Sequence, residues 1–358
     1  MKNSMIFKKK ILIIAEIGVN HNGKMTIAKK LILAAKKSGA DAVKFQNFSA
    51  EKLVTKNAKK APYQIRNTKN NKSQLEMLKK LELKRKNYFS LIKFCKAKNI
   101  KFLSSVFDPE SIDFLNKNLN IKTIKIPSGE ITNPLILNKL NLRKHTVILS
   151  TGMSNMREII SAINIIAKKQ IYKIYKNKII ITNHKKLKFI KKKLKILHCV
   201  TDYPVKDQFA NLQCINTMQN DLKIEVGYSD HTKGIIAPLI AVSKGAKIIE
   251  KHFTLDKKMN GPDHSASLDP KEFKKMVDSI RTYEIMNGDG IKKMFKCEII
   301  NKKIVRKSLV ASNNIKKGER FTYKNITTKR PGYGIPASNI HSNINKVSKK
   351  NYKTDDLI

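Results

Sequence analysis

Short apolar runs alternate with longer helical patterns eight times between Ile11 and about Met286. The apolar runs span residues 11–18, 41–46, 101–107, 123–129, 146–152, 194–200, 225–231 and 246–253. They are rich in β-branched residues, mostly apolar on both faces and bounded by turn residues, which is typical of buried parallel strands. The segments between them, such as residues 26–39 with a glycine at the end, show helical periodicity. Eight such units predict an α/β fold, the (β/α)₈ TIM barrel.

Two connecting segments depart from this regular pattern. Residues 47–87 are much longer than a usual connection from strand to helix and are rich in Lys and Asn, so we expect either a lid or a partly mobile segment. Residues 170–193 carry a dense lysine cluster before the sixth strand. We expect this second segment to be a solvated extension on the far side of the barrel.

The texture of the sequence changes near residue 303. Short β-like pieces, RKSLVAS and RFTYKNITTKR, are separated by the turn-rich pieces NNIKKGE and PGYGIP. The pattern predicts a barrel domain over residues 1–286, a linker over 287–302 and a small β-rich domain over 303–358. A domain of this size buries little core alone, so we expect it to pack on a barrel, its own or a partner's.

The chain is strongly basic, with 74 Lys and Arg against 27 Asp and Glu and a formal net charge of +47. Such a charge attracts polyanions at low salt. The basic residues are spread along the whole chain, Trp is absent and aromatic residues are 7%, whereas nucleic-acid binding favours basic residues on one face interleaved with aromatics. We therefore expect no specific nucleic acid partner, and binding to polyanions stays a distant alternative.

Neither the apolar runs nor the cysteines indicate a membrane or secreted protein. No run approaches the roughly 18 residues that a membrane span needs. The four cysteines, Cys95, Cys199, Cys214 and Cys297, form no CxxC pair and are expected to be reduced. We expect a cytoplasmic protein with no membrane contact.

Charged and imidazole side chains gather where the predicted strands end. They are Glu16, Lys44, Lys125, Glu130, His231 and His252. In a TIM barrel the C-terminal ends of the strands carry the active site, and a packed core would reject these groups. The pattern therefore points to an enzyme.

His231 and His252 end the seventh and eighth predicted strands. Adjacent strands lie about 4.8 Å apart, so two imidazoles at matching heights can share one divalent cation. Two protein ligands leave most coordination positions open, which fits a Lewis-acid site. The alternative is that each histidine is a hydrogen-bonded residue of the core or rim.

The carboxylates and lysines leave more than one interpretation open. Glu16 and Glu130 either pair with Lys44 or Lys125 in structural ion pairs or act as general bases and positioning groups. The lysines either bind an anion or form a Schiff base, as in an aldolase. Four serines at strand ends favour an anion cradle: Ser105, Ser128, Ser150 and Ser229. Asp263 lies in a turn after the last strand. It either caps that turn or takes part in the site at the barrel mouth.

Several segments in order resemble the sialic acid synthase (N-acetylneuraminate synthase) family. They are AEIGVNHNG, DAVKFQ, SQLEMLKKLEL, KIPSGEITN, ILSTGM, LHCVTDYP, GYSDHT, IEKHFTLD and GPDHSASLDP. The tail RKSLVASNNIKKGERFTYKNITTKRPGYGI is similar to the antifreeze-like (SAF) domain that follows the barrel in this family. The resemblance runs from about residue 11 to the end of the sequence.

The resemblance implies condensation of phosphoenolpyruvate with N-acetylmannosamine to N-acetylneuraminate and phosphate. It also implies a divalent cation, Mn²⁺ or Mg²⁺, held by His231 and His252. Phosphoenolpyruvate would be surrounded by Lys44, Ser105, Lys125, Ser128, Ser150, Thr201 and Ser229. Glu16 would place or activate the attacking water, Glu130 would position groups nearby, and Tyr203 and Asp263 would contact the sugar. Arg330 would reach the other subunit's site in a domain-swapped homodimer.

Two departures from the family pattern bear on the substrate. The third strand ends in Ser104, Ser105, Val106 and Phe107, where relatives commonly have Ser-Thr-Pro-Phe, and the tail has Tyr333 where Asn is usual. A bulkier residue beside Arg330 could alter the N-acyl pocket. A synthase of legionaminic or pseudaminic acid, which uses a diacetamido-trideoxyhexose, is therefore the alternative within the family.

Overall fold

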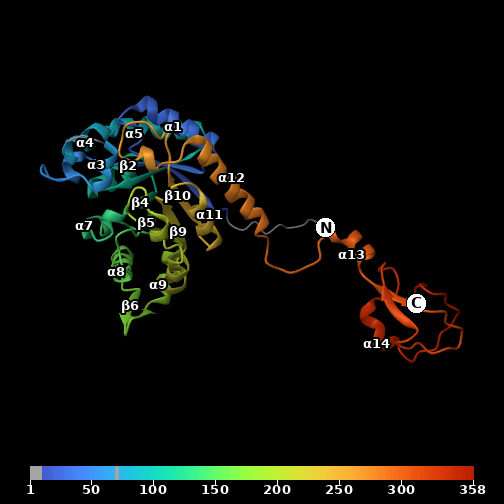
Figure 1. Cartoon of the computed structure of the whole chain (residues 1–358). Helices are drawn as coiled ribbons and strands as arrows, with labels where there is room; N and C mark the ends of the chain where they lie inside the picture. Colours follow the sequence, from blue (N-terminus) through green and yellow to red (C-terminus); the bar gives the residue numbers. More distant parts are fainter. Residues whose placement is uncertain (1–9, 69–71) are drawn as a thin grey trace. The chain divides into compact units, whose positions relative to one another are not determined.

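A computed structural model of the chain describes residues 10–68 and 72–358 (Figure 1). The chain divides into two compact units, one ending at Asn287 and the other spanning Gly288–Ile358. Within the described residues, no helix combines the length and the apolar composition that a membrane crossing requires.

The larger unit is built around a closed barrel of eight parallel strands. The strands are β1 (Leu12–Gly18), β2 (Ala42–Asn47), β3 (Lys101–Val106), β4 (Thr123–Ile126), β5 (Thr146–Ser150), β8 (Leu194–Cys199), β9 (Val226–Asp230) and β10 (Ile248–His252). Their order around the barrel is β1-β10-β9-β8-β5-β4-β3-β2. Each falls on a predicted apolar run, so the TIM-barrel prediction is confirmed.

Helices surround the barrel and form its outer layer (Figure 1). The longer ones are α1 (Met25–Lys37), α5 (Arg85–Ala97), α8 (Met156–Ala167), α9 (His184–Lys193), α10 (Cys214–Leu222), α11 (Ile236–Ser243) and α12 (Pro270–Met286). Shorter pieces after β3 and β4 are α6 (Pro109–Asp113), the π-helix η1 (Phe114–Asn118), the 3₁₀ helix η2 (Ser128–Glu130) and α7 (Pro134–Leu137). The 3₁₀ helices η3 (Asp207–Phe209) and η4 (His264–Ala266) follow β8 and β10.

Alternation along the strands divides the core into two parts. Side chains that point outward pack against the helices in the main hydrophobic cluster. Those that point inward form one apolar layer: Ile14, Ala42, Leu103, Ile148, Leu197 and Ile248. Two residues further along each strand, the inward positions become polar, as in Glu16, Lys44 and Glu250. The apolar layer therefore forms the floor of a polar chamber at the C-terminal strand ends.

The long segment after β2 is folded. It contains α2 (Ala50–Leu53), α3 (Pro62–Thr68) and α4 (Gln74–Leu81), and residues 69–71 lie outside the described residues. Phe48, Met77 and Leu81 belong to a buried cluster that includes Val19 from the β1 loop. Hydrophobic packing thus fixes this segment beside the barrel mouth.

The lysine-rich stretch before β8 differs from the expected solvated extension. It forms a hairpin, β6 (Tyr172–Tyr175) with β7 (Lys178–Ile181), followed by α9. Ile171 and Tyr172 are buried, and the Tyr172 hydroxyl donates to the Leu222 carbonyl at 2.5 Å. The stretch is therefore only partly solvated: most of its lysines and the hairpin residues Tyr175 and Ile180 are exposed, whereas Ile174, Ile179 and Ile181 pack against the main hydrophobic cluster.

The smaller unit has its own hydrophobic core. It contains α13 (Glu298–Val305), the antiparallel pair β11 (Ser308–Ala311) and β12 (Ile326–Lys329), the 3₁₀ helix η5 (Ala337–Asn339) and α14 (Ile340–Asn343). Leu309, Ala311, Ile315, Phe321 and Ile326 form its core. The β strands lie in the two predicted β-like pieces, whereas α13 occupies part of the segment that we expected to be a linker.

Candidate active site

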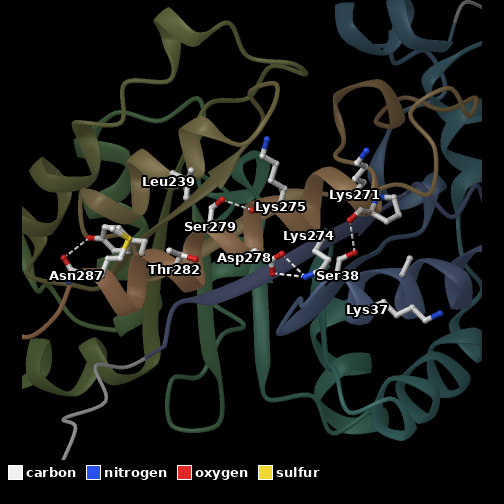
Figure 2. Close-up of a pocket in the computed structure, with 14 residues that line it drawn as sticks. Lys37, Ser38, Leu239, Lys271, Lys274, Lys275, Asp278, Ser279, Thr282 and Asn287 are labelled. Atoms are coloured by element: carbon white, nitrogen blue, oxygen red, sulfur yellow. Dashed lines mark hydrogen bonds and ion pairs between the residues drawn. The ribbon is translucent and has the colours of Figure 1, made fainter. Parts of the chain in front are cut away.

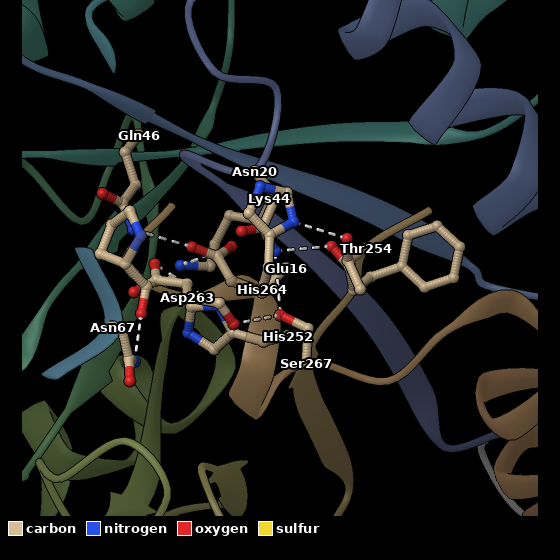
Figure 3. Close-up of polar contacts among 12 residues, drawn as sticks. Glu16, Asn20, Lys44, Gln46, Asn67, His252, Thr254, Asp263, His264 and Ser267 are labelled. Atoms are coloured by element: carbon tan, nitrogen blue, oxygen red, sulfur yellow. Dashed lines mark hydrogen bonds and ion pairs between the residues drawn. The ribbon is translucent and has the colours of Figure 1, made fainter. Parts of the chain in front are cut away.

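Glu16 on β1 and Lys44 on β2 form the first charged pair of the chamber (Figure 3). The Lys44 Nζ lies 3.0 Å from Glu16 Oε2, and both side chains are almost fully buried. Lys44 also donates to Ser105 Oγ at 2.9 Å, and Gln46 donates to Glu16 Oε1 at 3.2 Å. Burial raises the pKa of Glu16, although Lys44 opposes the shift. The ion pair is therefore present, and it lies within the site.

Lys125 on β4 has a carboxylate partner that the sequence analysis missed, Glu250 on β10. The Lys125 Nζ donates to Glu250 Oε1 at 3.1 Å, and Ser229 Oγ donates to the same oxygen at 3.0 Å. Lys44 Nζ lies 3.4 Å from it as well. Burial would raise the pKa of Glu250, but Lys125 and Lys44 outweigh burial and lower it to about 2. Two lysines and two carboxylates thus balance one another inside the barrel.

His231 directly follows β9 and His252 is the last residue of β10, and their ring centroids are 5.5 Å apart. His231 Nδ1 is 2.7 Å from the Val200 carbonyl, which assigns the proton to Nδ1 and leaves Nε2 free. Burial, with help from His231 and Lys44, holds the pKa of His252 well below its usual range. A neutral imidazole is the form that binds a cation.

Several buried polar atoms at this end of the barrel have no hydrogen-bond partner within the described part of the chain. They include Ser150 Oγ, Thr201 Oγ1 and His252 Nδ1. An unpaired buried polar atom costs free energy, so its presence at strand ends points to a bound ligand. Gly152 allows this arrangement, since a Cβ there would lie 2.1 Å from Thr201 Oγ1 and 2.8 Å from Ser128 Oγ.

Ser128 and Tyr203 border the same space. Ser128 Oγ, on η2, accepts from the Gly152 amide at 3.0 Å. The Tyr203 ring, in the loop after β8, lies 4.1 Å from the His231 ring and 5.5 Å from the His252 ring between centroids. Both residues are therefore within the group that the sequence analysis predicted.

Asp263 lies in the loop after β10, with Oδ2 3.8 Å from His252 Nδ1. The loop is anchored because Ser267 Oγ donates to the Asp263 carbonyl at 2.7 Å and receives the Asn20 amide at 2.9 Å (Figure 3). Burial, with Glu16 adding to it, raises the pKa of Asp263 to about 7. The Asp263 side chain is therefore buried beside a histidine, and it does not serve mainly to cap the turn.

Two further predicted residues are Glu130 and Arg330. Glu130 is half-buried at the end of η2, where Asn133 Nδ2 donates to its Oε2 at 2.7 Å, and burial followed by Asp108 raises its pKa. Arg330 belongs to the smaller unit, directly after β12. The hydrogen bond of Glu130 with Asn133 does not join it to the charged chamber.

A groove of about 1040 Å³ on the barrel unit lies away from the strand ends (Figure 2). It is lined by residues of α1, α11 and α12, among them Lys37, Leu239, Lys274 and Asp278. These residues belong to the outer helical layer and not to strand ends. The groove therefore lacks the combination of imidazole, carboxylate and serine groups that the chamber has.

Comparison with known proteins identifies the chain's relatives. The model of the NeuB family matches residues 31–292, and the model of the SAF domain matches residues 306–358. The chain belongs to the NeuB family. The first match covers most of the barrel unit that carries the chamber, and the second shows that the smaller unit contains a SAF domain.

Curated members of the NeuB family with similar sequences include synthases of different acidic sugars. The N,N'-diacetyllegionaminic acid synthase of Campylobacter jejuni is 50% identical over 98% of this chain and 99% of its own length. The enzyme of the same name from Legionella pneumophila is 43% identical over 93% and 88%. Human N-acetylneuraminate-9-phosphate synthase is 32% identical over 97% and 90%. The chain is thus a synthase of this NeuB group.

Among solved structures, the N-acetylneuraminic acid synthetase of Leptospira borgpetersenii in complex with citrate is similar. It has a TM-score of 0.67 and 31% identity, covering 82% of this chain and 90% of that one. The two NeuB-family chains share the barrel architecture over this length.

Proposed function

We propose that this NeuB-family enzyme condenses phosphoenolpyruvate with 2,4-diacetamido-2,4,6-trideoxymannose to give N,N'-diacetyllegionaminic acid and phosphate. The observation that carries this proposal is the 50% identity to the Campylobacter enzyme over nearly the full length of both chains. Identity to the pseudaminic acid and N-acetylneuraminate-9-phosphate synthases is 32%. These figures favour the diacetamido sugar over the N-acetylmannosamine that the motifs first implied.

The reaction needs a nucleophilic carbon, which phosphoenolpyruvate supplies, so no protein nucleophile is required. Carbon 3 of phosphoenolpyruvate bonds to the sugar aldehyde carbon, water adds to carbon 2, and phosphate leaves. Lys44 and Lys125 would hold the anionic donor together with hydroxyls at the strand ends. These hydroxyls belong to Ser105, Ser128, Ser150, Thr201 and Ser229.

Glu16 is the group proposed to orient the water and accept its proton. Its carboxylate lies in the chamber beside Lys44, and burial raises its pKa toward the range of an effective base. Glu130 is proposed to position groups at the edge of this site. It is a half-buried carboxyl after β4, and burial raises its pKa. A negative charge near the cationic centre that develops at carbon 2 stabilises it.

His231 and His252 are proposed to hold a divalent cation, Mn²⁺ or Mg²⁺. The donors fit because His231 Nε2 is left free and His252 Nδ1 is buried without a hydrogen-bond partner in the described residues. Such a cation, when bound, makes the aldehyde carbon more electrophilic. Tyr203 and Asp263 border the same histidines and are proposed to contact the sugar.

The proposed enzyme is a domain-swapped homodimer in which Arg330 of the SAF domain completes the site of the other subunit. Arg330 lies in KRPGYG, the segment by which the tail resembles the SAF domain of the family. A guanidinium suits hydrogen bonding to the acyl or hydroxyl oxygens of a sugar.

Phosphate release from phosphoenolpyruvate tests the proposed substrate. The assay uses Mn²⁺ and compares the diacetamido sugar with N-acetylmannosamine, and mass spectrometry identifies the product. We expect release that depends on the diacetamido sugar and stops with EDTA. Preference for N-acetylmannosamine would instead identify an N-acetylneuraminate synthase.

A further inference from the structure

Helix α3, within the long segment after β2, brings a second tyrosine to the mouth of the chamber. The ring of Tyr63 lies 4.7 Å from the ring of Tyr203 between centroids, with an angle of 38° between their planes. Tyr203 in turn lies 4.1 Å from His231. Three rings therefore follow one another from α3 down to a predicted metal ligand.

Contacts on two sides hold α3 in this place. Asn67 Nδ2 donates to the Pro262 carbonyl at 2.6 Å (Figure 3). Arg66 lies 3.9 Å from Asp202. Pro262 and Asp202 are the chain neighbours of Asp263 and Tyr203, the two residues proposed to contact the sugar. Helix α3 is thus attached to both loops that border the sugar position.

Tyr63 has an apolar ring and a polar hydroxyl, and the two lie in different surroundings. Burial raises the pKa of its hydroxyl, and Asp263 and Asp202 raise it further, so the phenol stays protonated. Gln64 Nε2 lies 3.4 Å from the hydroxyl. The ring packs against the Tyr203 ring, while the protonated hydroxyl is a hydrogen-bond donor.

The two candidate sugars differ at two carbons. Relative to N-acetylmannosamine, the diacetamido sugar has an acetamido group in place of the 4-hydroxyl and a methyl group in place of the hydroxymethyl at carbon 5. Both differences place additional apolar surface on the sugar. Aromatic faces bind such surface well, and a few polar groups then fix the orientation.

We propose that Tyr63 is a specificity-determining residue that, with Tyr203, forms an aromatic wall for the 4-acetamido and 6-deoxy end of the sugar. The inference rests on the proposed function, because it assumes that sugar binds beside His231 and Asp263. A pocket that gains or loses a methyl-sized contact discriminates by roughly 10–200-fold. Tyr63 therefore contributes to the choice of sugar and leaves phosphoenolpyruvate binding unaffected.

The test measures kcat/KM for both sugars with the full chain and its Y63A, Y63L and Y63F variants. Y63L retains bulk without an aromatic face, which keeps the test valid if Y63A does not fold. The matched control is I65A, because Ile65 lies on the same helix with 54% of its surface exposed.

We expect Y63A and Y63L to lower the preference for the diacetamido sugar by about tenfold or more, mainly through KM. The KM of phosphoenolpyruvate stays unchanged, Y63F keeps the preference because it keeps the aromatic face, and the control I65A behaves as the wild type. Equal losses for both sugars, or a raised KM for phosphoenolpyruvate, would show a merely structural role. An unchanged preference overturns the inference alone, whereas a wild-type enzyme that does not use the diacetamido sugar overturns the proposed function.

Discussion

Lys251 on β10 pairs with Asp230 on β9, one residue before each of the two predicted metal-binding histidines. The Lys251 Nζ lies 2.5 Å from Asp230 Oδ2, and both side chains are fully buried. The two residues are register partners, and they point away from the chamber because their neighbours Ser229 and Glu250 meet inside it. Polar contacts thus link the ends of β9 and β10 on both faces of the barrel wall: Ser229 with Glu250 inside the chamber and Lys251 with Asp230 on the other face.

Replacing Lys251 by Met is expected to weaken metal binding as well as the fold. The variant leaves Asp230 buried without its cation, which costs about 3–5 kcal/mol of unfolding free energy. Because outer groups orient metal ligands, we expect Mn²⁺ affinity to fall by roughly 10–100-fold. Urea unfolding and Mn²⁺ titration by electron paramagnetic resonance measure the two effects.

The control for this variant is K274M, which removes the exposed pair of Lys274 with Asp278. An exposed pair contributes at most about 1 kcal/mol, so stability and Mn²⁺ affinity should hardly change. Equal Mn²⁺ affinity in K251M and the wild type would show that the buried pair of Lys251 and Asp230 does not position the histidines.

His252 to Ala is expected to abolish Mn²⁺ binding and metal-dependent turnover while the barrel stays folded. His252 Nδ1 makes no hydrogen bond to the described residues, so the substitution removes few structural contacts. We expect affinity to fall by at least about 100-fold, since a direct ligand matters more than its outer partners. Circular dichroism checks the fold, and wild-type turnover in the variant would exclude His252 from the site.

Glu250 to Gln is expected to disturb the charge balance of the chamber. Within the described residues, the substitution leaves Lys44 paired with Glu16 and removes the carboxylate that pairs with Lys125. Breaking a buried pair costs about 3–5 kcal/mol of unfolding free energy. We also expect a higher KM for phosphoenolpyruvate, because Lys125 loses the carboxylate charge that holds its ammonium group in place.

The variant S229A is the matched comparison for E250Q. It removes one hydrogen bond to the same oxygen, Glu250 Oε1, and keeps every charge. Its expected cost is about 0.5–1.5 kcal/mol of unfolding free energy. If S229A destabilises the protein as much as E250Q, the charge of Glu250 is not the reason for the effect.

The sequence predicts the barrel well because each strand is a short β-branched run that is apolar on both faces. It predicts the site partly, since Glu16, Lys44 and Lys125 interrupt such runs and stand out. Glu250 does not stand out beside Lys251 and His252. Strand alternation would have found it, because positions 250 and 252 point to the same side of β10.

Other features depend on tertiary contacts that no local pattern encodes. The hairpin β6–β7 is short and lysine-rich, so its alternation of apolar and polar residues is a weak sequence signal. Only the structure shows that Tyr172 is buried. Tyr63 lies 140 residues from Tyr203 in the sequence, and only packing brings the rings together. The contacts of Asn67 with Pro262 and of Arg66 with Asp202 that hold α3 near Tyr203 are likewise between residues far apart in the sequence.

Acid is expected to destabilise the barrel unit through two buried histidines. Burial lowers the pKa of His21 and of His264 from 6.5 to about 4. Between these pH values the unfolded chain binds protons that the folded chain does not, so stability rises with pH. The free energy of unfolding should therefore fall as the pH decreases from 6.5 toward 4, as urea titrations at several pH values would show.

The variant H264N removes one of these titrations and should flatten the slope in that window. Asn can still reach the Thr254 hydroxyl, which lies 2.7 Å from His264 Nδ1. His184 is exposed, and H184N serves as the control for replacing a surface histidine by Asn. A slope that H264N does not alter would show that other groups cause the acid sensitivity.

The proposed swapped dimer predicts that two inactive variants restore each other. R330A keeps an intact barrel, and H252A keeps an intact SAF domain, so a mixed dimer holds one complete site. With random pairing of equal amounts, about a quarter of all sites become complete. We expect phosphate release at about that fraction of the wild-type rate after the mixed variants are refolded together, and none when they are assayed separately. If Arg330 acts within its own subunit, no mixed dimer contains a complete site and the mixture stays inactive.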